Sequence, residues 1–242
     1  MRYFQNDNSI LKEVETHISE KLGANVKIHS SDSLGGGCIN NASKIETSAG
    51  TFFLKWNGNC NPDMFLREAE SLEELRKAAN GKLVVPEVFA AKEVDASPGF
   101  LVLEYLEPGY ASGNSDEILG RGLAAIHQYT ADKFGFYHDN YCGSTSQNNS
   151  RKTNWSEFFR ENRLRFLLDL IQKERPLPAG DLQVYEQLLN KIPNLIPKNV
   201  EPALIHGDLW SGNYMNTSNG PALIDPASYY ADREMEMGIM TL

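Results

Sequence analysis

The sequence predicts an α+β protein with two lobes, the first rich in β-strands and the second mainly helical. Up to about residue 104, short apolar runs typical of strands alternate with turn signals. After Pro108-Gly109, longer stretches with helical periodicity dominate. A chain of 242 residues has room for one large domain or two small lobes. We therefore expect a first lobe at residues 1–104 and a second at 105–242, joined by a short connector.

The first lobe is expected to contain two helices and five strands. A helix over 8–22 has its apolar residues on one side and ends at Gly23, and a second helix covers 62–79. The strands are expected at 26–31, 38–46, 51–56, 88–94 and 100–106. The turn residues Thr47-Ser48-Ala49-Gly50 join the second and third strands into a hairpin.

The second lobe is expected to consist of helices followed by one β-hairpin. The periodicity of apolar residues predicts helices at about 115–129, 155–174 and 181–192. Residues 213–225 predict a hairpin that turns at Ser218-Asn219-Gly220, because these residue types favour turns.

The protein is acidic, and its negative charge is concentrated late in the chain. The net charge is −9, from 23 Lys+Arg against 32 Asp+Glu. Residues 201–242 hold six carboxylates and one base, Arg233, which accounts for −5 of that charge. A binder of nucleic acid or of an anionic membrane needs a basic surface, so neither partner is expected.

The cysteines and the N-terminus both favour a cytoplasmic location. The three cysteines, Cys38, Cys60 and Cys142, form no Cys-x-x-Cys pair, which fits neither a disulfide framework nor a zinc site. Residues 1–8 contain no apolar signal core. The apolar runs are also far shorter than the roughly 20 residues that a membrane span needs.

Residues 206–213, His-Gly-Asp-Leu-Trp-Ser-Gly-Asn, follow the spacing of a kinase catalytic loop. In that loop, His-Arg-Asp-Leu-x-x-x-Asn, the Asp is the catalytic base and the Asn binds Mg²⁺. Asp208 and Asn213 keep the same five-residue offset. We therefore expect Asp208 to be the base and Asn213 a metal ligand. Taken alone, His-Gly-Asp would be an ordinary turn.

Asp225 is expected to be the second metal ligand. Asn219 lies six residues from both Asn213 and Asp225, so a hairpin centred on it brings the two side chains together at its open end. Mg²⁺ prefers oxygen ligands and is usually held by one or two protein groups together with phosphates. Asp225-Pro226 alone would be a strand end, but the two motifs at this spacing favour a metal site.

The first lobe has two features suited to nucleotide phosphates. Gly35, Gly36 and Gly37 lie between two strands, where backbone N–H groups can approach phosphates closely. Lys55 ends an apolar strand, as the phosphate-pairing lysine of kinases does. Each feature alone is equally consistent with an ordinary strand turn or a solvated lysine.

The helix over 62–79 offers a partner for Lys55. Glu68 lies on the same stripe as Phe65 and Leu72, and a carboxylate facing the core needs a partner because a buried unpaired charge is costly. Glu70 instead groups with other charged residues on a face expected to be solvated. Those residues are Glu73, Glu74 and Lys77. We therefore expect Glu68 to pair with Lys55, the alternative being that Glu68 lies at the stripe's edge and reaches water.

The sequence resembles the fructosamine kinase (ketosamine 3-kinase) family, within the protein-kinase-like aminoglycoside phosphotransferase superfamily. The matching runs cover essentially the whole chain. They are Gly35–Asn40, Phe53–Trp56, Met64–Leu72, Leu101–Leu106, Phe134–Phe136, His206–Asn213 and Ile224–Glu234. The runs Asp-Leu-Trp-Ser-Gly-Asn and Tyr-Tyr-x-Asp-Arg-Glu are the narrowest signals of this family.

The resemblance implies a bilobal protein-kinase-like fold that binds ATP and Mg²⁺ between its lobes. It implies phosphorylation of a sugar hydroxyl, typically the 3-hydroxyl, of a ketosamine such as ribulosamine, erythrulosamine or fructosamine. The acceptor would be free or protein-linked, in a deglycation reaction. Glu104, Tyr105 and Leu106 would form the hinge whose backbone binds adenine. Asp208 would accept the hydroxyl proton, and Trp210 would pack against the sugar unless it is a core aromatic.

The resemblance also bears on Cys38 and on the end of the chain. Members of the family often carry a Cys at this position, so Cys38 is expected to be redox-sensitive and able to link two copies through a disulfide. The chain stops at Leu242, inside an expected helix, whereas relatives continue; an incomplete second lobe is therefore expected.

Two other functions remain open on the sequence. The acidic segment would suit a cationic acceptor, so a related kinase acting on an aminoglycoside or an amino alcohol is the main alternative. The third possibility is a non-catalytic ATP-binding protein.

Overall fold

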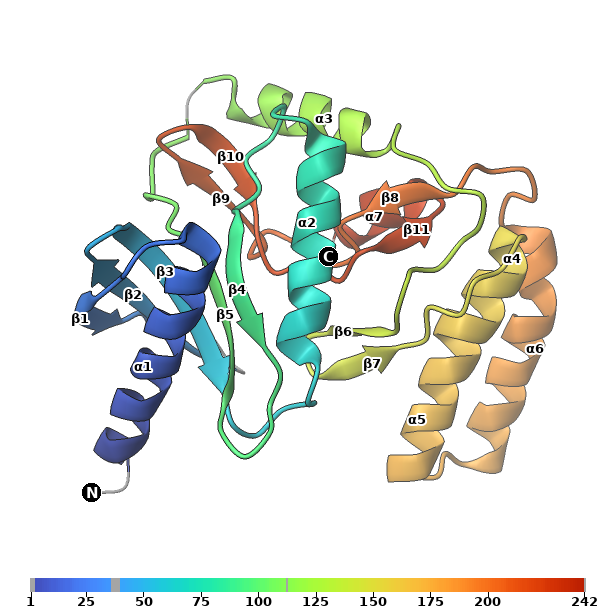
Figure 1. Ribbon diagram of the computed structural model, residues 1–242. Coiled ribbons are helices and arrows are strands. Elements are labelled where there is room, and N and C mark those ends of the chain that lie inside the picture. Colours follow the sequence, from blue (N-terminus) through green and yellow to red (C-terminus); the bar gives the residue numbers. More distant parts are fainter. Residues whose placement is uncertain (1–2, 36–39, 112, 242) are drawn as a thin grey trace.

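The computed structural model describes residues 3–35, 40–111 and 113–241 (Figure 1). A five-stranded antiparallel sheet with strand order β1-β2-β3-β5-β4 forms the N-terminal part. Its strands are β1 (Ile28–Ser33), β2 (Asn41–Thr47), β3 (Gly50–Asn57), β4 (Val88–Lys92) and β5 (Gly99–Glu104). Helices α1 (Tyr3–Leu22) and α2 (Met64–Ala79) pack against the sheet. These are the seven elements expected from the sequence, although α1 begins earlier and α2 later than predicted.

Strand β5 is buried on both faces because a helix covers each side of the sheet. Phe100 and Val102 pack in one apolar cluster with α1, whereas Leu101 and Leu103 pack in a second cluster with α2. Side chains alternate between the faces of a strand, so a continuous apolar run is what such a doubly covered strand requires. The sheet is thereby fixed between α1 and α2 (Figure 1).

Two hairpins in different parts of the chain close with the same local chemistry. The Thr47 hydroxyl donates to the Gly50 carbonyl at 2.9 Å, and the Thr217 hydroxyl donates to the Gly220 carbonyl at 2.8 Å. Each hydroxyl also accepts the backbone N–H two residues further on. Both glycines have positive φ, 125° and 108°, a conformation that other residues rarely adopt. Thr-Ser-x-Gly therefore sets the turn in both places.

Over the described residues 113–241, the chain contains helices and three small two-stranded sheets. Helix α3 (Ser115–Ile126) is followed by β6 (Asn140–Cys142), β7 (Thr145–Gln147), α4 (Trp155–Phe158), a π-helical segment (Phe159–Arg165), α5 (Phe166–Glu174) and α6 (Ala179–Leu195). Then come β8 (Ala203–Ile205), β9 (Tyr214–Thr217), β10 (Gly220–Leu223), β11 (Tyr229–Ala231) and α7 (Glu234–Ile239). Within the described ranges, no helix has the length and apolar character needed to cross a membrane.

The expected helices of this part are present, together with two small sheets that were not predicted. The helix predicted over 155–174 runs unbroken through α4, the π-helical segment and α5. Strand pairs β6–β7 and β8–β11 were not predicted, because strands of three residues are too short to show a period.

One apolar core runs from α2 into the C-terminal part of the chain. Leu72 and Leu75 of α2 belong to the same cluster as Leu123 of α3, Phe158 of α4 and Tyr229 of β11, and all five are at most 3% exposed. The two halves of the chain therefore share a core, and the boundary between residues 104 and 105 remains a prediction.

Two glycines of α3 provide a matched test of this packing. A Cβ on Gly122 would overlap the buried Leu83 side chain, whereas nothing lies within 4 Å of a Cβ on Gly120. We expect Gly122→Ala to lower the free energy of unfolding by about 1–3 kcal/mol through overpacking. Gly120→Ala should raise it by about 0.5–1 kcal/mol, because alanine favours the helix. Urea denaturation measures both; equal effects would contradict the described packing of α3.

Candidate active site

The segment from His206 to Asn213 lies between β8 and β9 and begins with a fully buried histidine. The Asp208 N–H donates to His206 Nδ1 over 3.3 Å, and His206 Nε2 lies 2.9 Å from the Ile224 carbonyl. Since Nδ1 accepts, Nε2 carries the proton and donates, which makes the ring neutral. Burial lowers the pKa of His206, in keeping with a neutral ring. His206 thus ties the loop to the end of β10.

Glu236 of α7 is a fully buried carboxylate to which the sequence analysis gave no role. Its Oε2 accepts the His206 N–H at 2.7 Å, and its Oε1 accepts the Gly207 N–H at 3.0 Å. His127 Nε2 lies 3.4 Å from Oε2. Burial raises the pKa of Glu236, but the hydrogen bonds from His127 and the two N–H groups hold it below its ordinary value. A charged Glu236 therefore fixes the backbone of the loop.

Gly207 occupies a position in this loop that requires glycine. Its φ is 84°, and a Cβ there would overlap the carbonyl oxygen of Ala227. The Ala227 N–H in turn donates to the His206 carbonyl at 2.9 Å. The loop and the segment after Asp225 can therefore approach closely only because Gly207 has no side chain.

Asp208 and Asn213 contact each other directly. Asn213 Nδ2 donates to Asp208 Oδ2 at 2.9 Å and to the Asp208 carbonyl at 2.7 Å, which leaves Oδ1 as the amide's acceptor. Burial raises the pKa of Asp208, and hydrogen bonds from Asn213 and Cys142 oppose that rise. Burial and the neighbouring Asp208 also raise the pKa of Cys142 to about 11, so its thiol is protonated and can donate. Cys142 is a neighbour of Asp208 that the sequence analysis missed.

The hairpin formed by β9 and β10 differs by one position from the prediction. Thr217 pairs with Gly220 across a two-residue turn, so the register places Asn213 opposite Ile224 rather than Asp225. Asp225 follows with φ of 53°, a left-handed conformation that aspartate tolerates better than most residues. The chain therefore changes direction at Asp225, whose carboxylate contacts Lys55.

Lys55 of β3 joins three parts of the site. Its Nζ lies 3.0 Å from both carboxylate oxygens of Glu68 on α2 and 2.9 Å from Oδ1 of Asp225. The side chains of Lys55 and Glu68 are only 12% and 11% exposed, so the predicted ion pair is present and Glu68 does not reach open water. Burial by itself would lower the pKa of Lys55, but the two carboxylates raise it above its ordinary value. Burial raises the pKa of Glu68, which Lys55 opposes.

The expected hinge, Glu104–Leu106, is tied to its neighbours on both sides. The Glu104 N–H donates to the Glu87 carbonyl at 2.9 Å, so the sheet already uses this donor. The Glu104 carboxylate accepts the Glu87 N–H at 3.2 Å and lies 3.6 Å from Arg76 Nη1. Further along, the Gly109 N–H donates to the Asn216 carbonyl of β9 at 2.8 Å. The connector thus links the sheet to the hairpin that carries Asn213.

Trp210 is a surface residue of the loop rather than a core aromatic. Its side chain is 49% exposed, and its ring lies over Gly212, where a Cβ would overlap it. The Trp210 N–H donates to the Asp208 carbonyl at 3.1 Å. An exposed aromatic ring is therefore held within two residues of Asp208.

The prediction that Glu74 lies on a solvated face of α2 is wrong. Its side chain is only 5% exposed and receives hydrogen bonds from Tyr137 and Tyr230 of the C-terminal part. Glu70, which was grouped with it, is 24% exposed.

Part of the expected site lies outside the described residues. Of the three glycines expected near phosphates, only Gly35 is described, and it is exposed. The site residues outside the described ranges are Gly36, Gly37 and Cys38. The disulfide-linked dimer expected through Cys38 gains no support from the described cysteines, because Cys60 and Cys142 are both free thiols.

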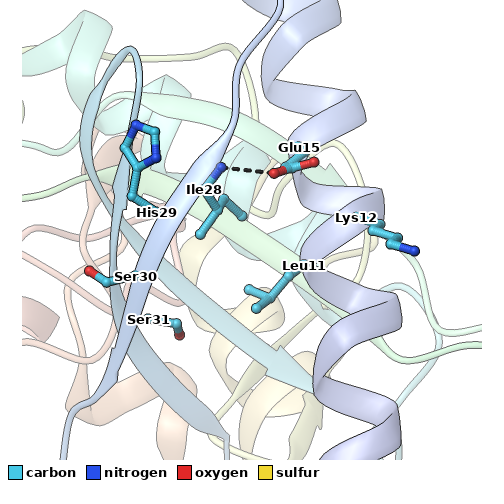
Figure 2. A pocket seen from close by; sticks show the side chains of 7 residues that line it. All are labelled: Leu11, Lys12, Glu15, Ile28, His29, Ser30 and Ser31. Carbon is cyan, nitrogen blue, oxygen red and sulfur yellow. Dashed lines mark hydrogen bonds between the residues drawn. The ribbon is translucent and has the colours of Figure 1, made fainter.

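A cavity of about 350 Å³ lies between α1 and β1 and includes none of the expected site residues (Figure 2). It is lined by Leu11, Lys12, Glu15, Ile28, His29, Ser30 and Ser31. In it, Glu15 Oε1 accepts the Ile28 N–H at 2.8 Å. This bond satisfies the first donor of β1, which forms one edge of the sheet. We assign the contact to holding α1 against the sheet.

The donor set of Asn213 and Asp225 fits a magnesium ion that also binds phosphate. It offers an amide oxygen and a carboxylate that is 51% exposed. Mg²⁺ is typically bound by one or two protein oxygens plus substrate phosphates. Over the described part of the chain, no group of three His, Cys, Asp or Glu side chains could hold a metal alone. The residues therefore suit a metal shared with a ligand better than a structural metal centre.

Comparisons with known sequences point to one family. A family model described as fructosamine kinase matches residues 10–242. A protein named protein-ribulosamine 3-kinase, chloroplastic, from Oryza sativa subsp. indica is 38% identical over 224 residues. That match covers 90% of this chain and 64% of the rice protein. The chain therefore spans less than two thirds of the length of this relative.

Solved structures share the fold. A crystal structure assigned as a fructosamine-3-kinase, from Haemophilus somnus, matches with a TM-score of 0.84 and 28% identity, over 100% of this chain and 79% of that chain. An aminoglycoside phosphotransferase solved with AMP-PNP and hygromycin B matches with a TM-score of 0.60 and 16% identity, over 92% of this chain and 74% of that chain. The second similarity concerns the fold alone. The predicted α+β, protein-kinase-like fold class is confirmed.

The loop's dependence on Glu236 can be tested by removing its carboxylate. Glu236→Ala leaves the His206 and Gly207 N–H groups buried without an acceptor, so we expect a loss of about 3–5 kcal/mol in unfolding free energy. Glu234→Ala, an exposed carboxylate in the same helix, should change it by less than about 0.5 kcal/mol. Equal losses in chemical denaturation would argue against a special role for Glu236.

Proposed function

The chain belongs to the fructosamine kinase family, and on that premise we propose that it transfers the γ-phosphoryl group of ATP to a sugar hydroxyl of a ketosamine. The observation that carries the proposal is the convergence of two contact groups from distant parts of the sequence. Lys55 contacts Glu68 and Asp225, while Asp208 contacts Asn213. Phosphoryl transfer needs positioned charges more than covalent chemistry, and this set supplies them.

We propose the 3-hydroxyl of a ribulosamine, erythrulosamine or fructosamine as the acceptor, either free or linked to a protein. The name of the rice relative, a protein-ribulosamine 3-kinase, supports this acceptor class. A reaction of this kind would serve deglycation, since phosphorylation adds a charged group to the sugar of a glycated amine. We also propose that the protein acts in the cytoplasm.

The first half of the chain would bind the nucleotide. Backbone groups of Glu104–Leu106 would contact adenine, and the N–H groups of Gly35–Gly37 would approach the phosphates. Lys55 would pair with phosphate oxygens, and Glu68 would hold its ammonium group in place. The pKa of Lys55 is raised by the carboxylates of Glu68 and Asp225, which supports this division of roles because a charged lysine presents a fixed cation to an anionic ligand.

Asp208 would accept the proton of the attacking hydroxyl. Its carboxylate is oriented by the amide of Asn213, so an oxygen is held in one direction. Trp210 would pack against the acceptor sugar, a role supported by its exposed ring within two residues of Asp208. Geometry of this kind favours proton transfer from a hydroxyl that is bound beside the loop.

Asn213 and Asp225 would hold Mg²⁺. When bound, the metal supplies positive charge that neutralises phosphate oxygens during transfer. The contact between Lys55 and Asp225 supports this proposal, because a shared polyphosphate ligand would need a cation beside the carboxylate that binds the metal.

A related kinase for an aminoglycoside or an amino alcohol is the second candidate. Its support is the acidic character of the site, because Asp208 and Asp225 are both at least partly exposed and would attract a cationic acceptor. A panel of acceptors separates the candidates. The protein is incubated with Mg-ATP and, separately, a ribulosamine, an erythrulosamine, a fructosamine, an aminoglycoside and an amino alcohol, and new phosphomonoesters are detected by phosphorus NMR.

We expect product from one or more ketosamines and none from the other acceptors. Product from the aminoglycoside alone would favour the second candidate. Nucleotide binding without product from any acceptor would favour a non-catalytic ATP-binding protein and would contradict the proposal.

Replacing Asp208 tests its role as the base. Asp208→Asn keeps the size of the side chain but removes its basicity, so we expect kcat to fall by about 10²–10⁴-fold. The dissociation constant for a nucleotide analogue should change by less than about threefold, because the base contacts the acceptor rather than ATP. Asp169→Asn, an exposed carboxylate of α5, serves as the control. Unchanged turnover in Asp208→Asn would remove Asp208 as the base.

A further inference from the structure

Glu74 of α2 is the buried carboxylate at the centre of a hydrogen-bonded group that no role proposed so far uses. Its Oε1 accepts from the Tyr137 hydroxyl at 2.8 Å and from the Tyr230 hydroxyl at 2.9 Å. Its Oε2 lies 3.1 Å from Nζ of Lys77, one turn further along the helix. Burial raises the pKa of Glu74, but both hydroxyls and Lys77 hold it below its ordinary value. The carboxylate is therefore charged and fully partnered.

The two tyrosines join α2 to separate segments of the C-terminal part. Tyr230 lies in β11, is 2% exposed and forms part of the shared apolar core. Tyr137 lies in the segment between α3 and β6 and is half exposed. Their hydroxyl oxygens are 3.5 Å apart, so one carboxylate oxygen receives two donors that converge from different directions.

Two further carboxylates, one in α2 and one just before it, contact the segment that contains Tyr137. Glu70 Oε1 lies 2.8 Å from Nδ1 of His138, and Asp63, just before the helix, accepts the Tyr141 hydroxyl at 2.6 Å. Contacts to residues 137–141 therefore occur at positions 63, 70 and 74, along most of the helix length. At its other end Arg76 donates to the carbonyl oxygen of Val85.

These contacts bracket Glu68, the partner of Lys55. Glu68 lies between Asp63 and Glu70 in the sequence. A shift or rotation of α2 that moved Glu68 away from Lys55 would therefore also break the contacts to residues 137–141 and to Tyr230. Each broken contact to Glu74 would leave a buried charge with fewer donors, which is costly. The position of Glu68 is thus coupled to hydroxyl groups that do not touch the proposed ATP site.

We propose that Glu74, Tyr137 and Tyr230 are positioning residues that clamp α2 to the C-terminal part of the protein and so present Glu68 to Lys55. The clamp makes the position of the ion pair depend on contacts that lie outside it. The kinetic consequence of the clamp rests on the proposed function, whereas the attachment of α2 to Tyr137 and Tyr230 does not. Lys77, on the same helix, holds the second oxygen of Glu74 and so orients the carboxylate.

The test removes the two hydroxyl groups and keeps both rings. In the double variant Tyr137→Phe/Tyr230→Phe, we expect the KM for ATP and the dissociation constant of AMP-PNP to rise about tenfold, since two hydrogen bonds to a charged group are lost. Amide hydrogen exchange in α2 should accelerate by a similar factor, because the helix opens more easily. The KM for the ketosamine should stay within about twofold, since the clamp does not touch the acceptor site.

Two controls separate clamping from general loss of stability. Tyr185→Phe removes a hydroxyl from a half-exposed tyrosine of α6 and should change nothing. Leu189→Ala, at a buried position of α6, should lower the stability of the protein by removing core packing. It should leave unchanged the KM for ATP, the dissociation constant of AMP-PNP and the hydrogen exchange of α2 relative to other helices. The stability loss of Leu189→Ala is compared with that of the double variant. If the two losses are equal and Leu189→Ala raises the KM for ATP as much as the double variant does, the clamp is overturned.

The clamp and the proposed function fail in different ways. Wild-type affinity for AMP-PNP together with wild-type exchange of α2 in the double variant would overturn the clamp, whatever the turnover. Wild-type protein without turnover would count against the proposed function only, because the binding and exchange measurements still decide the clamp.

Discussion

The candidate site depends on the ammonium group of Lys55, whose side chain is only 12% exposed. It lies between Glu68 and Asp225, and through them it joins the sheet, α2 and the turn after β10. A buried charge is tolerated only when it is paired, so the three elements must meet at one place. Because the partners come from positions 13 and 170 residues further along the chain, the ion-pair group restrains the fold as well as the site.

The loop that carries Asp208 is held by groups that would not contact the substrate. Glu236 holds two backbone N–H groups of the loop that carries Asp208, and the neutral ring of His206 ties that loop to the end of β10. The connector after β5 is attached to β9 through Gly109. Few residues would therefore contact the substrate. Buried carboxylates and backbone groups around them hold these residues in position.

Most helices and strands could be predicted from the sequence alone. The pairing of Lys55 with Glu68 could also be predicted, because the apolar stripe of the helix identifies which carboxylate faces inward. The sequence predicted the hairpin itself but not its register: Asn213 lies opposite Ile224 rather than Asp225, because the Thr217 hydroxyl sets a two-residue turn. Glu74 was wrongly placed on a solvated face and Glu236 was given no role, because partners from distant segments bury both and local periodicity does not reveal such partners. The same holds for strands of three residues, which only tertiary pairing defines.

The coupling between Lys55 and Glu68 in nucleotide binding tests this account most directly. The measurement is a calorimetric double-mutant cycle with AMP-PNP and Mg²⁺ on the wild type, Lys55→Met, Glu68→Gln and the double variant. If Glu68 acts by holding Lys55, each single change weakens binding, and Glu68→Gln costs almost nothing further once Lys55 is replaced. Losses that simply add would mean that the two residues act independently, and they would contradict the central role given to this ion pair.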